Sequence, residues 1–271
     1  MNEQQNNRNE VMPKINNIIT WNKLVAYLFF LFFSFSFSIY NFPAVSWSLP
    51  IVALISSFGF VALCNNLSND QNNKKLTLLP FSLVLALYIL ISPFLFFSLF
   101  NDISFMQILF LFMPCSIYVI SFKLFDFNNF TNKKAADFIN SSFIYCILVM
   151  LLTTLQQFSI DQINKFIILG LCLFLLSTSY LFNFSRRPIV NLLAAISVSA
   201  IFLEFWIIIE YFILSIPTTI LSGLIFFHLV AGLMDAELNK KLNITVMLEY
   251  CILAVGSATI IVYLENISFF Q

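Results

Sequence analysis

Residues 188–211 read PIVNLLAAISVSAIFLEFWIIIEY, a run of 24 residues with only two acidic side chains and no basic one. A helix needs about 20 predominantly apolar residues to cross the hydrocarbon core of a bilayer. Two arginines, Arg186 and Arg187, come directly before the run. An apolar run of this length next to basic residues predicts a membrane-spanning helix.

Eight further apolar segments, separated by short polar loops, have the same character. The nine segments cover approximately residues 24–40, 50–64, 77–100, 103–122, 135–155, 166–184, 188–211, 217–234 and 245–264. We therefore predict an all-α bundle of about nine transmembrane helices, which forms a single domain over residues 18–271. Eight or ten spans remain alternatives, because segments 50–64 and 166–184 carry the weakest signal. Residues 1–17 are polar and rich in asparagine, and we expect them to form a mobile tail.

The composition excludes a soluble domain of useful size. Hydrophobic residues make up 60% of the chain and charged residues 10%, whereas soluble domains carry about 25% charged residues. The mean hydropathy is +0.92. The lipid bilayer is therefore the predicted surrounding of most side chains. The formal net charge is zero, so nothing in the composition indicates a nucleic-acid partner.

The basic residues predict an orientation. Twelve of the 13 lie at the N-terminus or in every second loop, and basic loops stay on the cytoplasmic side of a membrane. These twelve residues are Arg8, Lys14, Lys23, Lys74, Lys75, Lys123, Lys133, Lys134, Arg186, Arg187, Lys240 and Lys241. Lys165 is the exception. With nine spans, the N-terminus is expected in the cytoplasm and the C-terminus outside.

Ionisable side chains within the apolar segments concentrate in residues 188–264, at Glu204, His228 and Glu249. A charge at the centre of a membrane helix costs about 2.5–3.5 kcal/mol, so each of them invites an explanation. The helical rise puts Glu204 about 6 Å to the outer side of the midplane, His228 about 4–5 Å and Glu249 about 7–8 Å to the inner side. His228 and Glu249 are thus candidates for a titratable pair that serves transport. Alternatively, Glu249 reaches the headgroups or pairs with Lys240 or Lys241, while His228 bonds a serine or a backbone carbonyl.

The sequence lacks the side chains that a metal site, a disulfide framework or a phosphate-binding loop would need. The single histidine excludes a multi-histidine zinc site, and no pair of metal ligands occurs at a useful spacing. The five cysteines are scattered singly within the apolar segments, so they predict neither a disulfide framework nor a metal site. No glycine-rich phosphate loop occurs. The sequence therefore predicts no catalytic residue, no metal site and no cofactor.

The final third of the chain, from Arg187 to about Leu264, resembles uncharacterised multi-pass membrane proteins of the candidate-phyla (patescibacterial) bacteria. The resemblance is carried by Glu204 with the aromatic residues after it, by Phe226-Phe227-His228 leading to Gly232-Leu233, and by Leu248-Glu249-Tyr250 with Gly256. It implies a multi-pass protein of a bacterial cytoplasmic membrane. It implies no particular activity.

Three functions remain open. The first is a non-enzymatic membrane scaffold or assembly partner, which scarce glycine, minimal loops and few intramembrane polar groups favour. Its partner would be another membrane protein or a further copy in a homo-oligomer. The second is a permease or a transporter of lipids or small solutes that uses Glu204, His228 and Glu249. The third is a lipid-modifying membrane enzyme, which the absence of clustered acid and base residues in the loops disfavours.

Overall fold

The computed structural model describes residues 3–40, 48–65, 75–99, 105–124, 130–158, 160–182, 188–212 and 214–269. Over these ranges the chain forms helices and no strand, which confirms the all-α class. The helices are α1 (Glu3–Tyr40), α2 (Ser48–Asn65), α3 (Lys75–Leu99), α4 (Phe105–Leu124), α5 (Phe130–Gln157), α6 (Gln162–Phe182), α7 (Pro188–Tyr211), α8 (Ile216–Leu238) and α9 (Ile244–Phe269). Each of the nine expected apolar segments coincides with one of them.

Six of these helices are long and apolar enough to cross a membrane. Their apolar stretches are Asn22–Tyr40, Asp137–Gln157, Gln162–Leu181, Ile189–Tyr211, Ile216–Leu238 and Ile244–Tyr263. Three shorter apolar stretches, Ser48–Leu63, Phe81–Phe97 and Gln107–Ser121, lie in α2, α3 and α4. The chain therefore has the helices of a membrane protein, with six of clear spanning length. A total of nine spans depends on the three shorter ones.

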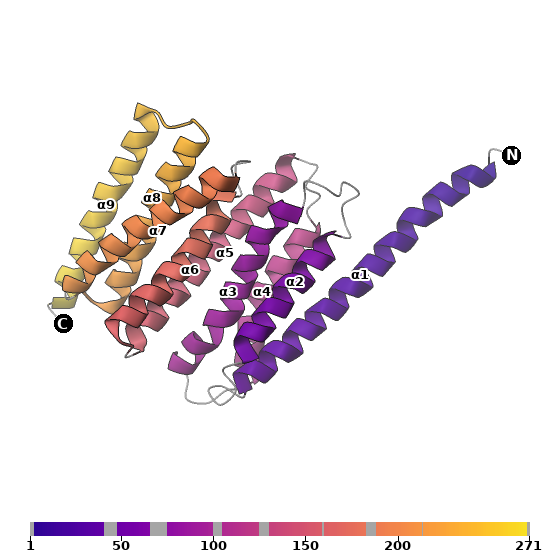
Figure 1. Cartoon of the computed structure of the whole chain (residues 1–271), viewed down its shortest axis with the longest axis horizontal. Coiled ribbons are helices and arrows are strands. Elements are labelled where there is room, and N and C mark those ends of the chain that lie inside the picture. Colours follow the sequence, from indigo (N-terminus) through magenta and orange to yellow (C-terminus); the bar gives the residue numbers. More distant parts are fainter. Residues whose placement is uncertain are drawn as a thin grey trace.

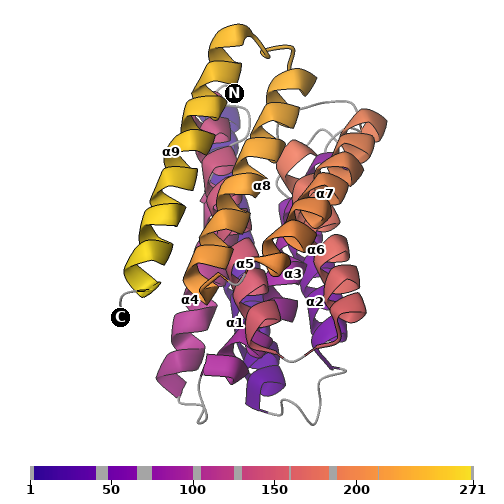
Figure 2. The same cartoon turned by 90° about the vertical axis from the view of Figure 1, so that its left-hand side faces the viewer.

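Consecutive helices run antiparallel, as short connections require. The Tyr27 hydroxyl of α1 donates a 2.5 Å hydrogen bond to the Ser56 carbonyl of α2. At the other end of the same pair, the Ser38 and Ser48 hydroxyls lie 3.4 Å apart. Figure 1 shows the resulting row of helices, with the first half of α1, including its polar residues 3–17, extending beyond the bundle. Of the helices that the structure describes, α9 packs against α8 alone, and it stands at one edge (Figure 2).

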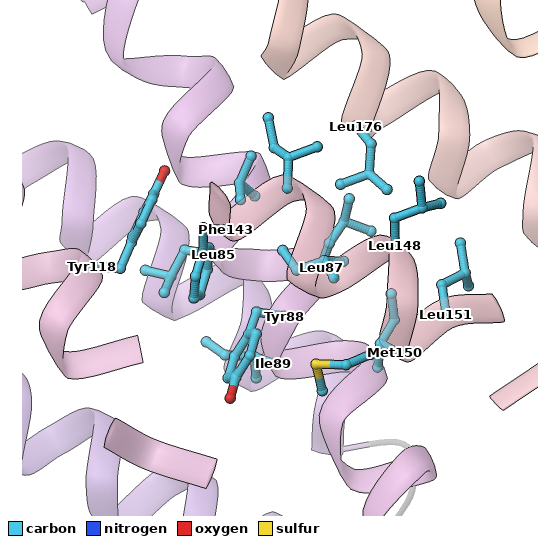
Figure 3. Packing of buried hydrophobic residues seen from close by; sticks show 14 of the residues in the cluster. Leu85, Leu87, Tyr88, Ile89, Tyr118, Phe143, Leu148, Met150, Leu151 and Leu176 are labelled. Carbon is cyan, nitrogen blue, oxygen red and sulfur yellow. The ribbon is translucent and has the colours of Figure 1, made fainter. Parts of the chain in front are cut away.

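Helices α3 and α5 occupy the centre of the bundle, where apolar side chains from neighbouring helices interdigitate (Figure 3). The Tyr118 ring of α4 stacks on Phe143 of α5 at 4.4 Å, and Phe143 stacks on Tyr88 of α3 at 4.9 Å. The Tyr118 hydroxyl donates to the Asn140 side-chain oxygen at 2.7 Å and lies 3.2 Å from the Phe81 carbonyl. Because lipid provides no hydrophobic drive between helices, such packing and hydrogen bonds hold a membrane bundle together.

Candidate functional site

Glu204 lies on the outer surface of the bundle. Among the described helices, α7 packs against α6 and α8 only, and its residues Phe202 and Trp206 are buried there. Residues three and four apart share one side of a helix, and one such set on α7 is exposed throughout. We call this set the Glu204 face; it consists of Leu193, Ser197, Ala200, Glu204, Ile208 and Tyr211.

Glu204 lies near the middle of the apolar stretch of α7. Ala200 is the middle residue of the apolar stretch Ile189–Tyr211, so Glu204 lies about 6 Å from the midplane of that stretch. Its carboxylate has no hydrogen bond or ion pair with any residue that the structure describes. Glu210, nearer the helix end, instead accepts a 3.1 Å bond from the Trp206 indole N–H. Glu204 is thus an ionisable side chain at membrane depth without a partner among the described parts of its own chain.

His228 is half-buried on the side of α8 that faces α5, next to the middle residue of the α8 stretch, Phe227. Its Nδ1 atom lies 2.7 Å from the Tyr145 hydroxyl of α5, and the tautomer decides which of the two donates. The Tyr145 ring also meets the Tyr180 ring of α6 edge-on, with the ring centroids 6.4 Å apart. The Tyr250 ring of α9 lies 6.0 Å from the imidazole, centroid to centroid. These four side chains connect α5, α6, α8 and α9, so His228 belongs to a polar network within the bundle.

Helices α8 and α9 make specific side-chain contacts near both ends of the surface that they share. The Tyr250 ring lies directly over Gly232, so close that a Cβ atom on Gly232 would overlap the tyrosine hydroxyl. At the opposite end, a Glu265 oxygen accepts hydrogen bonds from the Ser215 backbone N–H at 2.9 Å and from its hydroxyl at 2.8 Å. Ser215 is the N-cap of α8. A carboxylate is favourable at this position because the N-terminal end of a helix carries a partial positive charge.

Glu249 lies on the exposed side of α9. Its side chain has neither a hydrogen bond nor an ion pair within the described ranges, and the expected contact with His228 is made by Tyr145 instead. The three acid and base candidates therefore do not form one site. Glu204 and Glu249 face outward from α7 and α9, while His228 faces the interior.

Sequence reasoning overlooked the tyrosines of the network, Tyr145, Tyr180 and Tyr250. Tyrosine is common at membrane interfaces, so its presence alone marks no interior site. The contact between Tyr145 and His228 spans 83 positions of sequence, and only the folded chain reveals it. Across the described residues, no group of three His, Cys, Asp or Glu side chains is placed to hold a metal ion.

An open groove lies between α1 and α2, far along the row of helices from α7 (Figure 1). Its volume is about 330 Å³, and its walls are mainly apolar. The lining residues are Phe33, Ser34, Phe37, Ser48, Ile51 and Val52. None of them is ionisable, so the groove suits an acyl chain or an apolar side chain better than a polar substrate.

A family model described as a protein of unknown function, DUF5656, matches residues 24–264. The chain belongs to this family. The match begins at Leu24, in the first apolar stretch of α1, and ends in α9, so the family covers the whole bundle rather than its final third alone. It leaves out the polar first part of α1. No curated protein and no solved structure matches the chain.

Proposed function

We propose that the protein is a non-enzymatic membrane scaffold or assembly partner, and that its last three helices carry the interaction surface. The observation that supports this most strongly is the direction of Glu204, which faces outward from α7. An ionisable side chain that serves transport has to face the interior of the bundle or a water-filled cavity. An outward carboxyl at this depth instead calls for a hydrogen-bonding partner from another membrane-spanning helix.

The energetic cost of leaving Glu204 in lipid favours the same function. A charged residue near the centre of a membrane helix costs about 2.5–3.5 kcal/mol on insertion scales. Polar side chains between membrane helices form hydrogen bonds that lower this cost and hold the helices together. A partner helix that covers Glu204 would therefore stabilise both chains. Glu249, exposed on α9, extends the same polar character to the edge of the bundle.

A permease is the second candidate, supported by the hydrogen bond between His228 and Tyr145, with the Tyr180 ring beside it. A tyrosine hydroxyl bonded to an imidazole is able to pass a proton to it or take one from it. This function predicts solute uptake that depends on pH and is lost in Glu204→Gln. Uptake into vesicles that remains unchanged in Glu204→Gln would remove Glu204 from any transport mechanism.

We further propose that all nine helices cross a bacterial cytoplasmic membrane, with the N-terminus in the cytoplasm and the C-terminus outside. The distribution of basic residues supports this orientation, although Lys74, Arg186 and Arg187 lie outside the described residues. Cysteines introduced at Asn73 and Ser268, in a variant without native cysteines, test it with a reagent that does not cross membranes. We expect labelling of the two from opposite sides; labelling from the same side would contradict nine spans.

Photocrosslinking in intact membranes tests the assembly function. A photoreactive phenylalanine analogue at Ile208 lies on the Glu204 face, and the same analogue at Leu171 lies on the exposed side of α6. The two native side chains are similarly exposed, at 55% and 62%, which makes Leu171 a matched control. We expect Ile208 to yield protein crosslinks and Leu171 to yield lipid adducts. Lipid adducts alone at both positions would exclude a partner on this face.

A further inference from the structure

The His228 imidazole has one nitrogen atom with a hydrogen-bond partner and one without. Nδ1 lies 2.7 Å from the Tyr145 hydroxyl. Nε2 has no hydrogen bond or ion pair with any residue that the structure describes, and it is not sealed within the bundle. An imidazole nitrogen that meets only lipid loses the hydrogen bond that it would make in water. Nε2 is therefore an open hydrogen-bonding position on a half-buried side chain.

Three helices contribute to this position. His228 lies on α8, Tyr145 on α5 and Tyr250 on α9. The centroids of the Tyr145 and Tyr250 rings lie 5.8 Å and 6.0 Å from the centroid of the imidazole. Among the described helices, α5 and α9 each pack against α8 and make no contact with each other. A flat ring that approaches between α5 and α9 is therefore offered the imidazole and two tyrosine rings.

The depth of His228 restricts which compounds are able to reach it. His228 is one residue from the middle of the stretch Ile216–Leu238, which puts it about 1.5 Å from the midplane of that stretch. The hydrocarbon core of a bilayer is about 30 Å thick, so phospholipid headgroups and ester carbonyls lie about 15 Å away. A charged headgroup does not enter at this depth without a large cost. The ligand of Nε2 therefore has to be neutral and to carry its polar atom into the hydrocarbon.

We infer that His228, Tyr145 and Tyr250 bind the ring of an isoprenoid quinone. A quinone ring is neutral, enters hydrocarbon together with its apolar tail, and carries carbonyl oxygens that accept hydrogen bonds. When the Tyr145 hydroxyl donates to Nδ1, Nε2 carries the hydrogen and donates it to such a carbonyl. In the other tautomer Nε2 accepts, and a hydroxyl of the reduced quinol donates. The two tyrosine rings provide aromatic contact with the flat ring.

Photolabelling of the purified full-length chain in phosphatidylcholine and phosphatidylglycerol vesicles tests the inference. The probe is an azido derivative of a short-chain ubiquinone, and the unmodified short-chain ubiquinone is the competitor. We expect saturable labelling of peptides from α5, α8 or α9 that the competitor suppresses. Farnesol has an isoprenoid chain and a hydroxyl but no quinone ring, and it should compete about tenfold more weakly. Equal competition by farnesol, or labelling that excess ubiquinone does not suppress, would overturn the inference.

Variants of the site identify the side chains that bind the ring. His228→Phe keeps a planar ring and removes Nε2, so the probe concentration for half-maximal labelling should rise about tenfold. Tyr250→Leu leaves His228 in place and removes one aromatic contact, so the same concentration should rise severalfold. Tyr263→Leu, at an exposed tyrosine of the same helix, is the matched control and should label as the wild type does. Circular dichroism verifies the fold of each variant.

Wild-type labelling in folded His228→Phe would overturn the inference. If His228→Phe does not fold, wild-type labelling in Tyr250→Leu would overturn it instead. None of these residues belongs to the Glu204 face, so the result is independent of the assembly function.

Discussion

The Tyr145 hydroxyl lies 2.7 Å from Nδ1 of His228 and joins α5 to α8 across 83 positions of sequence. The bond gives the only histidine of the chain a structural partner inside the bundle. In lipid, a polar side chain without such a partner would be costly. His228 is therefore explained by packing between helices, and a role in transport is not needed to account for it.

The coupling between Tyr145 and His228 is measurable. We predict that Tyr145→Phe and His228→Ala each destabilise the protein in detergent, and that their combination costs less than the sum. The difference should be about 0.6 kcal/mol and at most about 1.7 kcal/mol, the range of hydrogen bonds between membrane helices. The same cycle with Glu249→Ala and His228→Ala should be additive. Coupling between Glu249 and His228 would restore the expected acid–base pair and contradict the network.

Gly232 is predicted to be intolerant of even a methyl group. Gly232→Ala places its Cβ against the Tyr250 ring and hydroxyl, so either the Tyr250 side chain or α9 itself has to move away from α8. We expect a loss of about 1–3 kcal/mol in unfolding free energy, as for other overpacked positions. Gly256→Ala is the matched control on α9, because no atom lies within 4 Å of its new Cβ. Equal thermal stability of the two variants would contradict the close approach of Tyr250.

The bond from Tyr118 to Asn140 is predicted to stabilise the centre of the bundle. Tyr118→Phe leaves the buried Asn140 oxygen without its 2.7 Å donor, which costs about 1–3 kcal/mol. The double variant Tyr118→Phe, Asn140→Leu should recover much of the loss, since both polar groups are then gone. Thermal unfolding in detergent measures both. Tyr263→Phe, at an exposed tyrosine of α9, serves as the control and should leave the stability unchanged.

Glu265 is predicted to hold the end of α9 against the start of α8. Glu265→Ala removes the acceptor of two hydrogen bonds from Ser215, and we expect a loss of about 1–3 kcal/mol together with faster hydrogen exchange in α9. Glu265→Gln keeps an acceptor oxygen and should lose less. Glu249→Ala provides an exposed comparison on the same helix. Hydrogen exchange as fast in Glu249→Ala as in Glu265→Ala would contradict a specific role for Glu265.

The helices could be predicted from the sequence because length and apolarity suffice to define a membrane-spanning segment. The direction in which each side chain points could not. Apolar residues lie on all sides of α7. The sequence therefore contains no polar stripe on this helix from which the direction of Glu204 could be inferred. Its outward direction follows only from the packing of α7 on α6 and α8.

The network around His228 was hidden for a related reason. The sequence puts His228 and Glu249 at similar depth on adjacent helices, and α8 and α9 do pack together. Neighbouring residues on a helix point about 100° apart, and here Tyr250 takes the inward direction while Glu249 points out. A depth estimate from the helical rise contains no such rotation, and it also gives no sign that Tyr145 of α5 reaches His228.

The most direct test of the assembly proposal is the native mass of the protein extracted from its own membrane in a mild detergent. Wild type and Glu204→Gln should migrate as a complex larger than a single chain with its micelle, and Glu204→Ala should migrate as the single chain. A wild-type protein that already runs as a single chain, with the same mass as Glu204→Ala, would contradict the proposal that Glu204 faces a partner.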